Sequence, residues 1–162
     1  MEILSFEAEV LALADALRAR GWRLATAESC TGGLIAAACT ALAGSSDWFE
    51  RGFVTYSDEA KTDMLDVPAA LIRSHGAVSD SVARAMVQGA LRHSRAQVAA
   101  AVTGIAGPGG AVPGKPVGTV WLAWGTAVTM HSECLQLAGD RDAVRAATVQ
   151  AALMRLQQEA SA

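Results

Sequence analysis

The stretch that decides the fold is LATAESCTGGLIAAACTALAG, residues 24–44. Its beginning belongs to a short apolar run that predicts a buried strand over residues 22–27, and its end predicts a helix of small residues over 34–42. The sequence ESCTGG, residues 28–33, separates the two. Because an ordinary turn needs only one or two polar or glycine residues, this segment predicts a turn that also holds a ligand or a reacting group.

The composition predicts a globular protein with one core. The chain has 162 residues, of which 52% are apolar and 18% are charged. This predicts a single domain over residues 1–162 and excludes a disordered or fibrous chain. The apolar runs are shorter than the roughly 18–20 residues that span a bilayer, and the N-terminus lacks the basic residues of a signal peptide. We therefore expect a soluble cytoplasmic protein without a membrane interaction.

The net charge and the spacing of the cysteines and histidines argue against a nucleic-acid-binding protein and against a local metal site. The formal net charge is −3 and the Lys and Arg residues form no stripe, which argues against a nucleic-acid-binding surface. The three cysteines have no CxxC spacing and the three histidines stand apart, so no local metal-ligand pattern is present. We expect reduced cysteines, no metal and no other cofactor.

Helical and strand-like segments alternate along the chain. The predicted helices cover residues 7–20, 34–42, 58–65, a short segment after Pro68, 82–92 and 143–158. The predicted strands cover residues 22–27, 52–56, 98–102, 119–124 and 128–137, and the last two form a hairpin. This order predicts an α/β fold, a three-layer α/β/α domain with a mixed, mainly parallel sheet and one hairpin.

Polar clusters stand at the carboxyl ends of predicted strands or at the start of predicted helices. They cover residues 28–33, 56–61, 103–110 and 140–145. Ligands of open α/β sheets bind beyond the carboxyl ends of the strands. We therefore expect these clusters to converge on one site.

The first cluster allows two interpretations. Ser29 or Thr31 could serve only as a helix cap. Alternatively, Gly32 and Gly33 leave backbone N–H groups open to a phosphate or an oxyanion, and the neighbouring hydroxyl acts as a nucleophile. The pattern is neither G-x-S-x-G nor a Walker loop, so both interpretations stay open.

The other clusters supply a candidate base and a candidate anion site. Lys61 could accept a proton if burial lowers its pKa, or it could be a surface residue paired with Asp58. Arg141 and Arg145 lie four residues apart, on one helix face, and suit a phosphate or carboxylate, or else pair with nearby aspartates. The loop after Thr103 is either a flexible turn or a backbone surface that lies flat against a ligand.

Several segments between residues 26 and 145 together resemble one known family, and they occur in the order in which that family has them. They are TAESCTGG, GSSDWFERGFVTYSDEAK, HGAVS, VTGIAGPGG, KPVGTVW and GDRDAVR. They look like the CinA C-terminal-domain family, and the number of long motifs makes the resemblance specific. It implies a cytoplasmic bacterial amidohydrolase that converts a small-molecule nucleotide, nicotinamide mononucleotide, to nicotinate mononucleotide and ammonia without an obligatory metal.

By position, the resemblance implies Ser29 as the nucleophile and Lys61 as the general base, with Tyr56 and Thr103 in the catalytic polar network. Arg141 and Arg145 match the family's basic pair, to which we assign the phosphate. The remaining candidates for substrate contact are Glu28, Thr31, Gly32, Gly33, Gly104 and Gly107. Two roles are open for Glu28, which could orient Lys61 or balance the charge of a pyridinium ring.

Two other functions stay open at this point. A phosphoryl-transfer enzyme would use the glycine turn for phosphate, although the sequence shows no paired carboxylates to hold its metal. A non-catalytic nucleotide-binding or protein-interaction module of the same fold is the second alternative. Trp121 and Trp124, together with the small-residue helices, predict apolar surface and therefore a homodimer.

Overall fold

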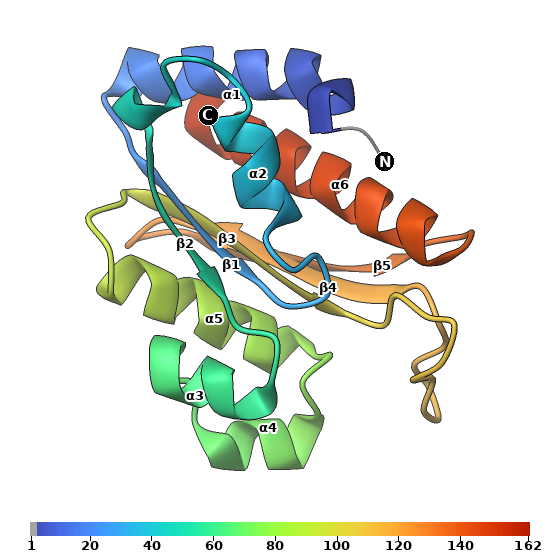
Figure 1. Ribbon diagram of the computed structural model, residues 1–162. Coiled ribbons are helices and arrows are strands. Elements are labelled where there is room, and N and C mark those ends of the chain that lie inside the picture. Colours follow the sequence, from blue (N-terminus) through green and yellow to red (C-terminus); the bar gives the residue numbers. More distant parts are fainter. Residues whose placement is uncertain (1–2) are drawn as a thin grey trace.

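The computed structural model describes residues 3–162, which form one five-stranded sheet with helices on both faces (Figure 1). The strands are β1 (Leu24–Glu28), β2 (Phe49–Val54), β3 (Val98–Gly104), β4 (Thr119–Gly125) and β5 (Met130–Gln136), in the order β2-β1-β3-β4-β5. β1 is parallel to both β2 and β3, and β4 is antiparallel to both β3 and β5. Within the described chain β4 alone runs against the other strands, so the expected mixed, mainly parallel sheet with one hairpin is confirmed.

The helices form the two outer layers. One face of the sheet carries α1 (Glu7–Arg20), α2 (Leu34–Thr40) and α6 (Arg141–Ser161), and the other carries α3 (Asp58–Leu65), α4 (Ala69–His75) and α5 (Asp80–Arg92) (Figure 1). Short 3-10 helices lie at Ile3–Phe6 and Ser45–Asp47. The three-layer α/β/α arrangement is confirmed, while some bounds differ. β2 starts at residue 49 rather than 52 because Phe49 already pairs with Leu24.

Each face of the sheet has its own apolar core. Along β3, Val98, Ala100 and Val102 pack with α1 and α6, whereas Ala99 and Ala101 pack with α5. This is the two-residue period of a strand that is buried on both faces. The alanines have short side chains, so the helices can lie close to the sheet.

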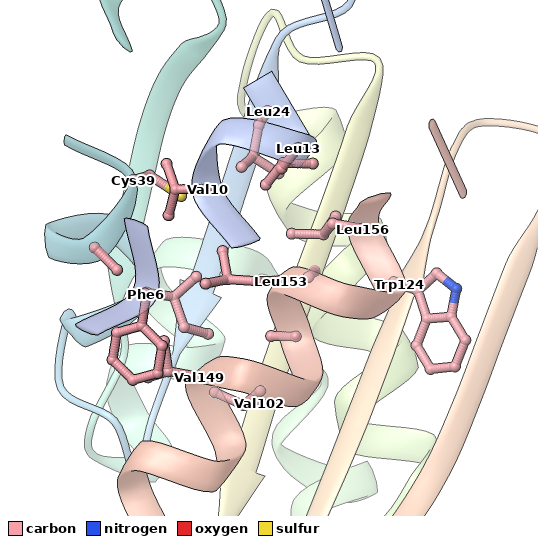
Figure 2. Close-up of a cluster of buried hydrophobic side chains, with 14 of the residues drawn as sticks. Phe6, Val10, Leu13, Leu24, Cys39, Val102, Trp124, Val149, Leu153 and Leu156 are labelled. Carbon is pink, nitrogen blue, oxygen red and sulfur yellow. The ribbon is translucent and has the colours of Figure 1, made fainter. Parts of the chain in front are cut away.

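The first core is closed by helices from the two ends of the chain. Figure 2 shows Leu13 of α1 and Leu153 and Leu156 of α6 in the same cluster as Leu24 of β1. All four side chains are fully buried. Burial of a leucine side chain is worth about 1.5–3 kcal/mol, so this cluster holds α1 and α6 firmly over the strands.

The two tryptophans do not provide the apolar surface expected of them. Trp124 is only 9% exposed; it stacks on His131 and lies under the guanidinium of Arg155. Trp121 is half-buried and packs against the core on the α5 side. The homodimer therefore stays a prediction without this support.

Membrane association was not expected from the sequence. Among the helices of residues 3–162, none has both the length and the apolar character needed to cross a lipid bilayer. The cytoplasmic location stays a prediction.

Candidate functional site

Three parallel strands end side by side at the site. Glu28, the last residue of β1, pairs with Val54 at the end of β2 and with Val102 of β3. The Ser29 N–H donates to the Val102 carbonyl over 3.0 Å, and the Thr55 N–H donates to the Glu28 carbonyl over 2.8 Å. This register brings the polar residues that follow each strand to one edge of the sheet, where the sequence led us to expect them.

A cavity of about 280 Å³ opens at this edge. Its lining includes many of the predicted site residues: Ser29, Tyr56, Lys61, Thr103, Gly104, Gly107 and Arg141. Residues of the lining that we had not named individually as site residues are Cys30, Asp58, Ala77, Val78, Ile105, Ala106, Gly109 and Gly110. The predicted residues outside the lining are Glu28, Thr31, Gly32, Gly33 and Arg145. The HGAVS motif was the sequence signal for the segment at 77–78.

Lys61 is the buried centre of the site. The residue is 1% exposed, and its side chain extends from the start of α3 back to the turn that precedes the helix. Its Nζ lies 2.9 Å from the carbonyl oxygen of Thr55, 3.2 Å from that of Tyr56 and 3.4 Å from that of Ser57. The same Nζ lies 3.0 Å from Ser29 Oγ. The amine therefore contacts a backbone turn and one hydroxyl, and the Ser29 hydroxyl itself donates to the Tyr56 carbonyl of this turn over 3.5 Å.

This environment suits a lysine that changes its protonation state. Burial lowers the pKa of Lys61 from its ordinary value of 10.5, and nearby Asp58 and Cys30 oppose the shift. A neutral amine donates two hydrogens, which matches the two nearest carbonyls, and leaves its lone pair for the Ser29 hydroxyl. An ammonium donates a third hydrogen to Ser29 Oγ. The same contacts thus hold the amine before and after it takes a proton.

The rim of the cavity is tied together by Arg141 and Thr103. The Tyr56 side chain is largely exposed, and its hydroxyl accepts a hydrogen bond of 3.2 Å from Nη2 of Arg141. Nη1 of Arg141 donates to the Gly107 carbonyl over 2.8 Å. Thr103 Oγ1 donates to the Ala77 carbonyl over 3.0 Å. These bonds connect the β2–α3 turn, the glycine loop and the segment before α5.

Glu28 caps α2 and does not contact Lys61. It is 1% exposed, and its carboxylate accepts from the N–H groups of Ile35 at 2.8 Å and Ala36 at 3.0 Å and from the Thr31 hydroxyl at 2.6 Å. N–H groups in the first turn of a helix have no acceptor within the helix, and negative charge there is favoured by the helix dipole. The carboxylate therefore does not orient Lys61 by a direct contact, and its observed hydrogen bonds are to α2 and Thr31.

The two glycines of the turn have left-handed backbone conformations. Gly32 has φ 59° and Gly33 has φ 106°, values that other residues rarely adopt. The Gly32 N–H donates to the Ser29 carbonyl over 3.0 Å, and the Leu34 N–H donates to the Thr31 carbonyl over 3.2 Å. The Gly32 amide, which we expected to face an oxyanion or a phosphate, is thus committed to a protein acceptor. The conformation of the turn itself accounts for the glycine pair.

Arg145 follows Arg141 by one helical turn but points to the turn rather than into the cavity. Its Nε donates to the Cys30 carbonyl over 3.2 Å, and its Nη2 donates to the Thr31 carbonyl over 3.1 Å. The guanidinium therefore ties α6 to the segment that carries Ser29. We expected the two arginines to bind a phosphate jointly. In the structure Arg141 lines the cavity, whereas Arg145 lies outside the cavity lining.

Cys30 borders the cavity beside Ser29. Burial raises the pKa of the Cys30 thiol to about 12, so the thiol stays protonated near neutral pH and is a poor nucleophile. No group of three or more His, Cys, Asp or Glu side chains lies together, as metal ligands would, within the described residues 3–162.

Residues 7–160 match the CinA C-terminal domain family. The chain belongs to this family. Two relatives carry the name nicotinamide-nucleotide amidohydrolase PncC. The one from Pseudomonas putida is 55% identical over 87% of this chain and 88% of the relative, and the one from Escherichia coli K12 is 52% identical over 90% and 88%. A CinA-like protein of Syntrophobacter fumaroxidans is 51% identical over 88% of this chain, which spans 34% of that longer relative.

Solved structures of CinA proteins share the fold. The competence/damage-inducible protein CihA from Agrobacterium tumefaciens matches with a TM-score of 0.91 and 45% identity, covering 93% of each chain. A CinA superfamily protein from Klebsiella pneumoniae matches with a TM-score of 0.92 and 40% identity, covering 99% of each chain. The resemblance read from the sequence motifs is therefore confirmed for this CinA family member.

The capping role of Glu28 can be tested by stability. Glu28→Gln replaces one carboxylate oxygen by an NH2 group, which donates and cannot accept, so a buried donor near α2 loses its partner. We expect the free energy of unfolding to fall by about 1–3 kcal/mol, measured by urea denaturation. Glu59→Gln makes the same change at an exposed residue of α3 and should cost less than about 1 kcal/mol. Equal stability of Glu28→Gln and the unmodified protein would contradict the capping role.

Proposed function

We propose that this chain is an amidohydrolase that converts nicotinamide mononucleotide to nicotinate mononucleotide and ammonia, with Ser29 as nucleophile and Lys61 as general base. The observation that carries the proposal is the 3.0 Å contact between Lys61 Nζ and Ser29 Oγ at the wall of the cavity. The names of the two PncC relatives, which this chain matches over most of their length, support the substrate and the reaction.

The proposed reaction has two stages. Ser29 Oγ attacks the carboxamide carbon while its proton passes to the neutral amine of Lys61. The C–N bond then breaks, the Lys61 proton leaves with the amine as ammonia, and an ester joins Ser29 to the nicotinoyl group. Water attacks this ester and gives one proton to Lys61, which returns it to Ser29 as the C–O bond of the ester breaks, and the carboxylic acid product releases the second proton of water to solvent.

The two arginines have different tasks in this proposal. Arg141 lines the cavity, carries a fixed positive charge and has the planar donor arrangement that suits a phosphate. We assign the nucleotide phosphate to Arg141. Arg145 lies outside the cavity lining and donates to the carbonyls of Cys30 and Thr31, next to Ser29, so we assign to it the positioning of Ser29. An anchored phosphate fixes the carboxamide against Ser29 and lowers the barrier by orientation.

Ammonia release from nicotinamide mononucleotide tests the proposal directly. We expect release without added metal, and we expect Ser29→Ala and Lys61→Ala each to lower kcat by at least about 10³-fold. Ser46→Ala, at an exposed serine outside the cavity lining, should leave kcat unchanged. Near-normal kcat in either site variant would contradict the assigned roles. Binding of the nucleotide without ammonia release by the unmodified chain would favour the non-catalytic module.

The pH dependence of the reaction follows from the state of Lys61. Because only the neutral amine accepts the Ser29 proton, kcat/KM should rise with pH as Lys61 loses its proton. Burial lowers the pKa of Lys61, so the midpoint of this rise should lie below 10.5. Steady-state kinetics from about pH 5 to pH 10 would measure it. A kcat/KM that falls steadily with rising pH in this range would contradict the assignment of Lys61 as base.

The different roles assigned to Arg141 and Arg145 predict different kinetic effects of replacing them. Arg141→Ala should raise KM by about tenfold or more, because the phosphate loses charge-assisted hydrogen bonds. Arg145→Ala should chiefly lower kcat, because the Ser29 turn loses two hydrogen bonds. Both variants are compared in the ammonia assay over a range of substrate concentrations. A raised KM in Arg145→Ala together with a lowered kcat in Arg141→Ala would contradict this assignment and indicate that Arg145 binds the phosphate.

A further inference from the structure

Asp58 is a charged residue of the cavity that the proposed reaction leaves unused. It lines the cavity together with Ser29 and Lys61. Asp58 is the first residue of α3 and stands three positions before Lys61, so the two side chains lie on one face of the helix. The Asp58 charge also acts on Lys61, since it raises the pKa of the amine against the effect of burial. The carboxylate is therefore within electrostatic range of the reacting groups.

The carboxylate of Asp58 has no protein partner in the described part of the chain, where it makes neither a hydrogen bond nor an ion pair. Arg141, the cationic residue at the rim of the same cavity, bonds instead to the Tyr56 hydroxyl and the Gly107 carbonyl. The cavity thus carries a negative charge on the Lys61 side and a separate positive charge on α6. Such an arrangement complements a ligand with one positive and one negative group.

We propose that Asp58 is a specificity-determining residue that selects substrates whose amide-bearing ring is positively charged. The inference rests on the proposed function. Nicotinamide mononucleotide has a pyridinium ring bonded to the carboxamide carbon and a phosphate at its other end. With the carboxamide at Ser29 and the phosphate at Arg141, the charged ring would occupy the cavity that Asp58 also lines. The carboxylate attracts this ring and offsets its repulsion from Lys61 whenever that lysine is protonated.

A neighbouring cavity supplies a matched control. Asp58 also lines a second cavity of about 290 Å³ at α3 and α4, whose charged residues further include Glu59, Asp63 and Arg73. Asp63 lies on the same helix as Asp58 and is likewise exposed, but it lines only the second cavity. Asp63→Asn therefore removes the same charge by the same chemical change without altering the catalytic cavity.

The test compares nicotinamide mononucleotide with its reduced form, whose ring is an uncharged dihydropyridine while the phosphate, ribose and carboxamide are retained. Binding of both is measured by calorimetry in Ser29→Ala protein, which does not consume the substrate. Asp58→Asn should weaken binding of the oxidised nucleotide about two- to fivefold, the range for an exposed ion pair, and leave the reduced form unaffected. Added salt should shrink the difference. Asp58→Glu should preserve the preference, and Asp63→Asn should change neither affinity.

Equal weakening of both nucleotides by Asp58→Asn, unchanged binding of both, or the same loss with Asp63→Asn would overturn the inference. Ammonia release by the unmodified protein is measured in parallel. If release occurs but the ring preference does not depend on Asp58, the inference fails and the proposed function stands. If the protein neither binds nicotinamide mononucleotide nor releases ammonia from it, the proposed function fails and the inference fails with it.

Discussion

The buried amine of Lys61 is the constraint on which the site depends. An amine that is removed from water is costly unless its hydrogen-bonding groups find partners. Three successive carbonyls, those of Thr55, Tyr56 and Ser57, lie within hydrogen-bonding distance of Nζ, and Ser29 Oγ lies 3.0 Å from it. The β2–α3 turn therefore does more than connect two elements. It holds the amine at the serine, and burial keeps the amine easier to deprotonate than a lysine in water.

The sheet register supplies this geometry. Glu28 and Val54 pair at the ends of two parallel strands, so the residues that follow them, Ser29 and Thr55, emerge next to one another. Two further interactions fix the segment that carries the serine. The Glu28 carboxylate holds N–H groups of α2, and the Arg145 guanidinium holds carbonyls of the turn from α6. Elements from the first and last parts of the chain thus converge on one hydroxyl group.

Sequence patterns predicted the elements well because their signals are local. Ser57, Ser79 and Asp140 each cap a helix by accepting the N–H group three residues later, as expected of these residue types. The directions of side chains were not predictable. A glutamate at the end of a strand, or an arginine near the start of a helix, looks the same in the sequence whether its side chain faces a ligand or the protein. Glu28 and Arg145 face the protein, and only the packed structure decides this.

The protonation of Lys61 can be measured directly, because the chain has only two lysines, Lys61 and Lys115. Selective ¹⁵N labelling of lysine side chains would give two Nζ signals in NMR spectra, and Lys115→Arg would leave the signal of Lys61 alone. The account predicts that this signal titrates with a pKa below 10.5, as burial of the amine requires. A titration at or above 10.5 would contradict the account, since Lys61 would then be held as an ammonium that cannot take the Ser29 proton.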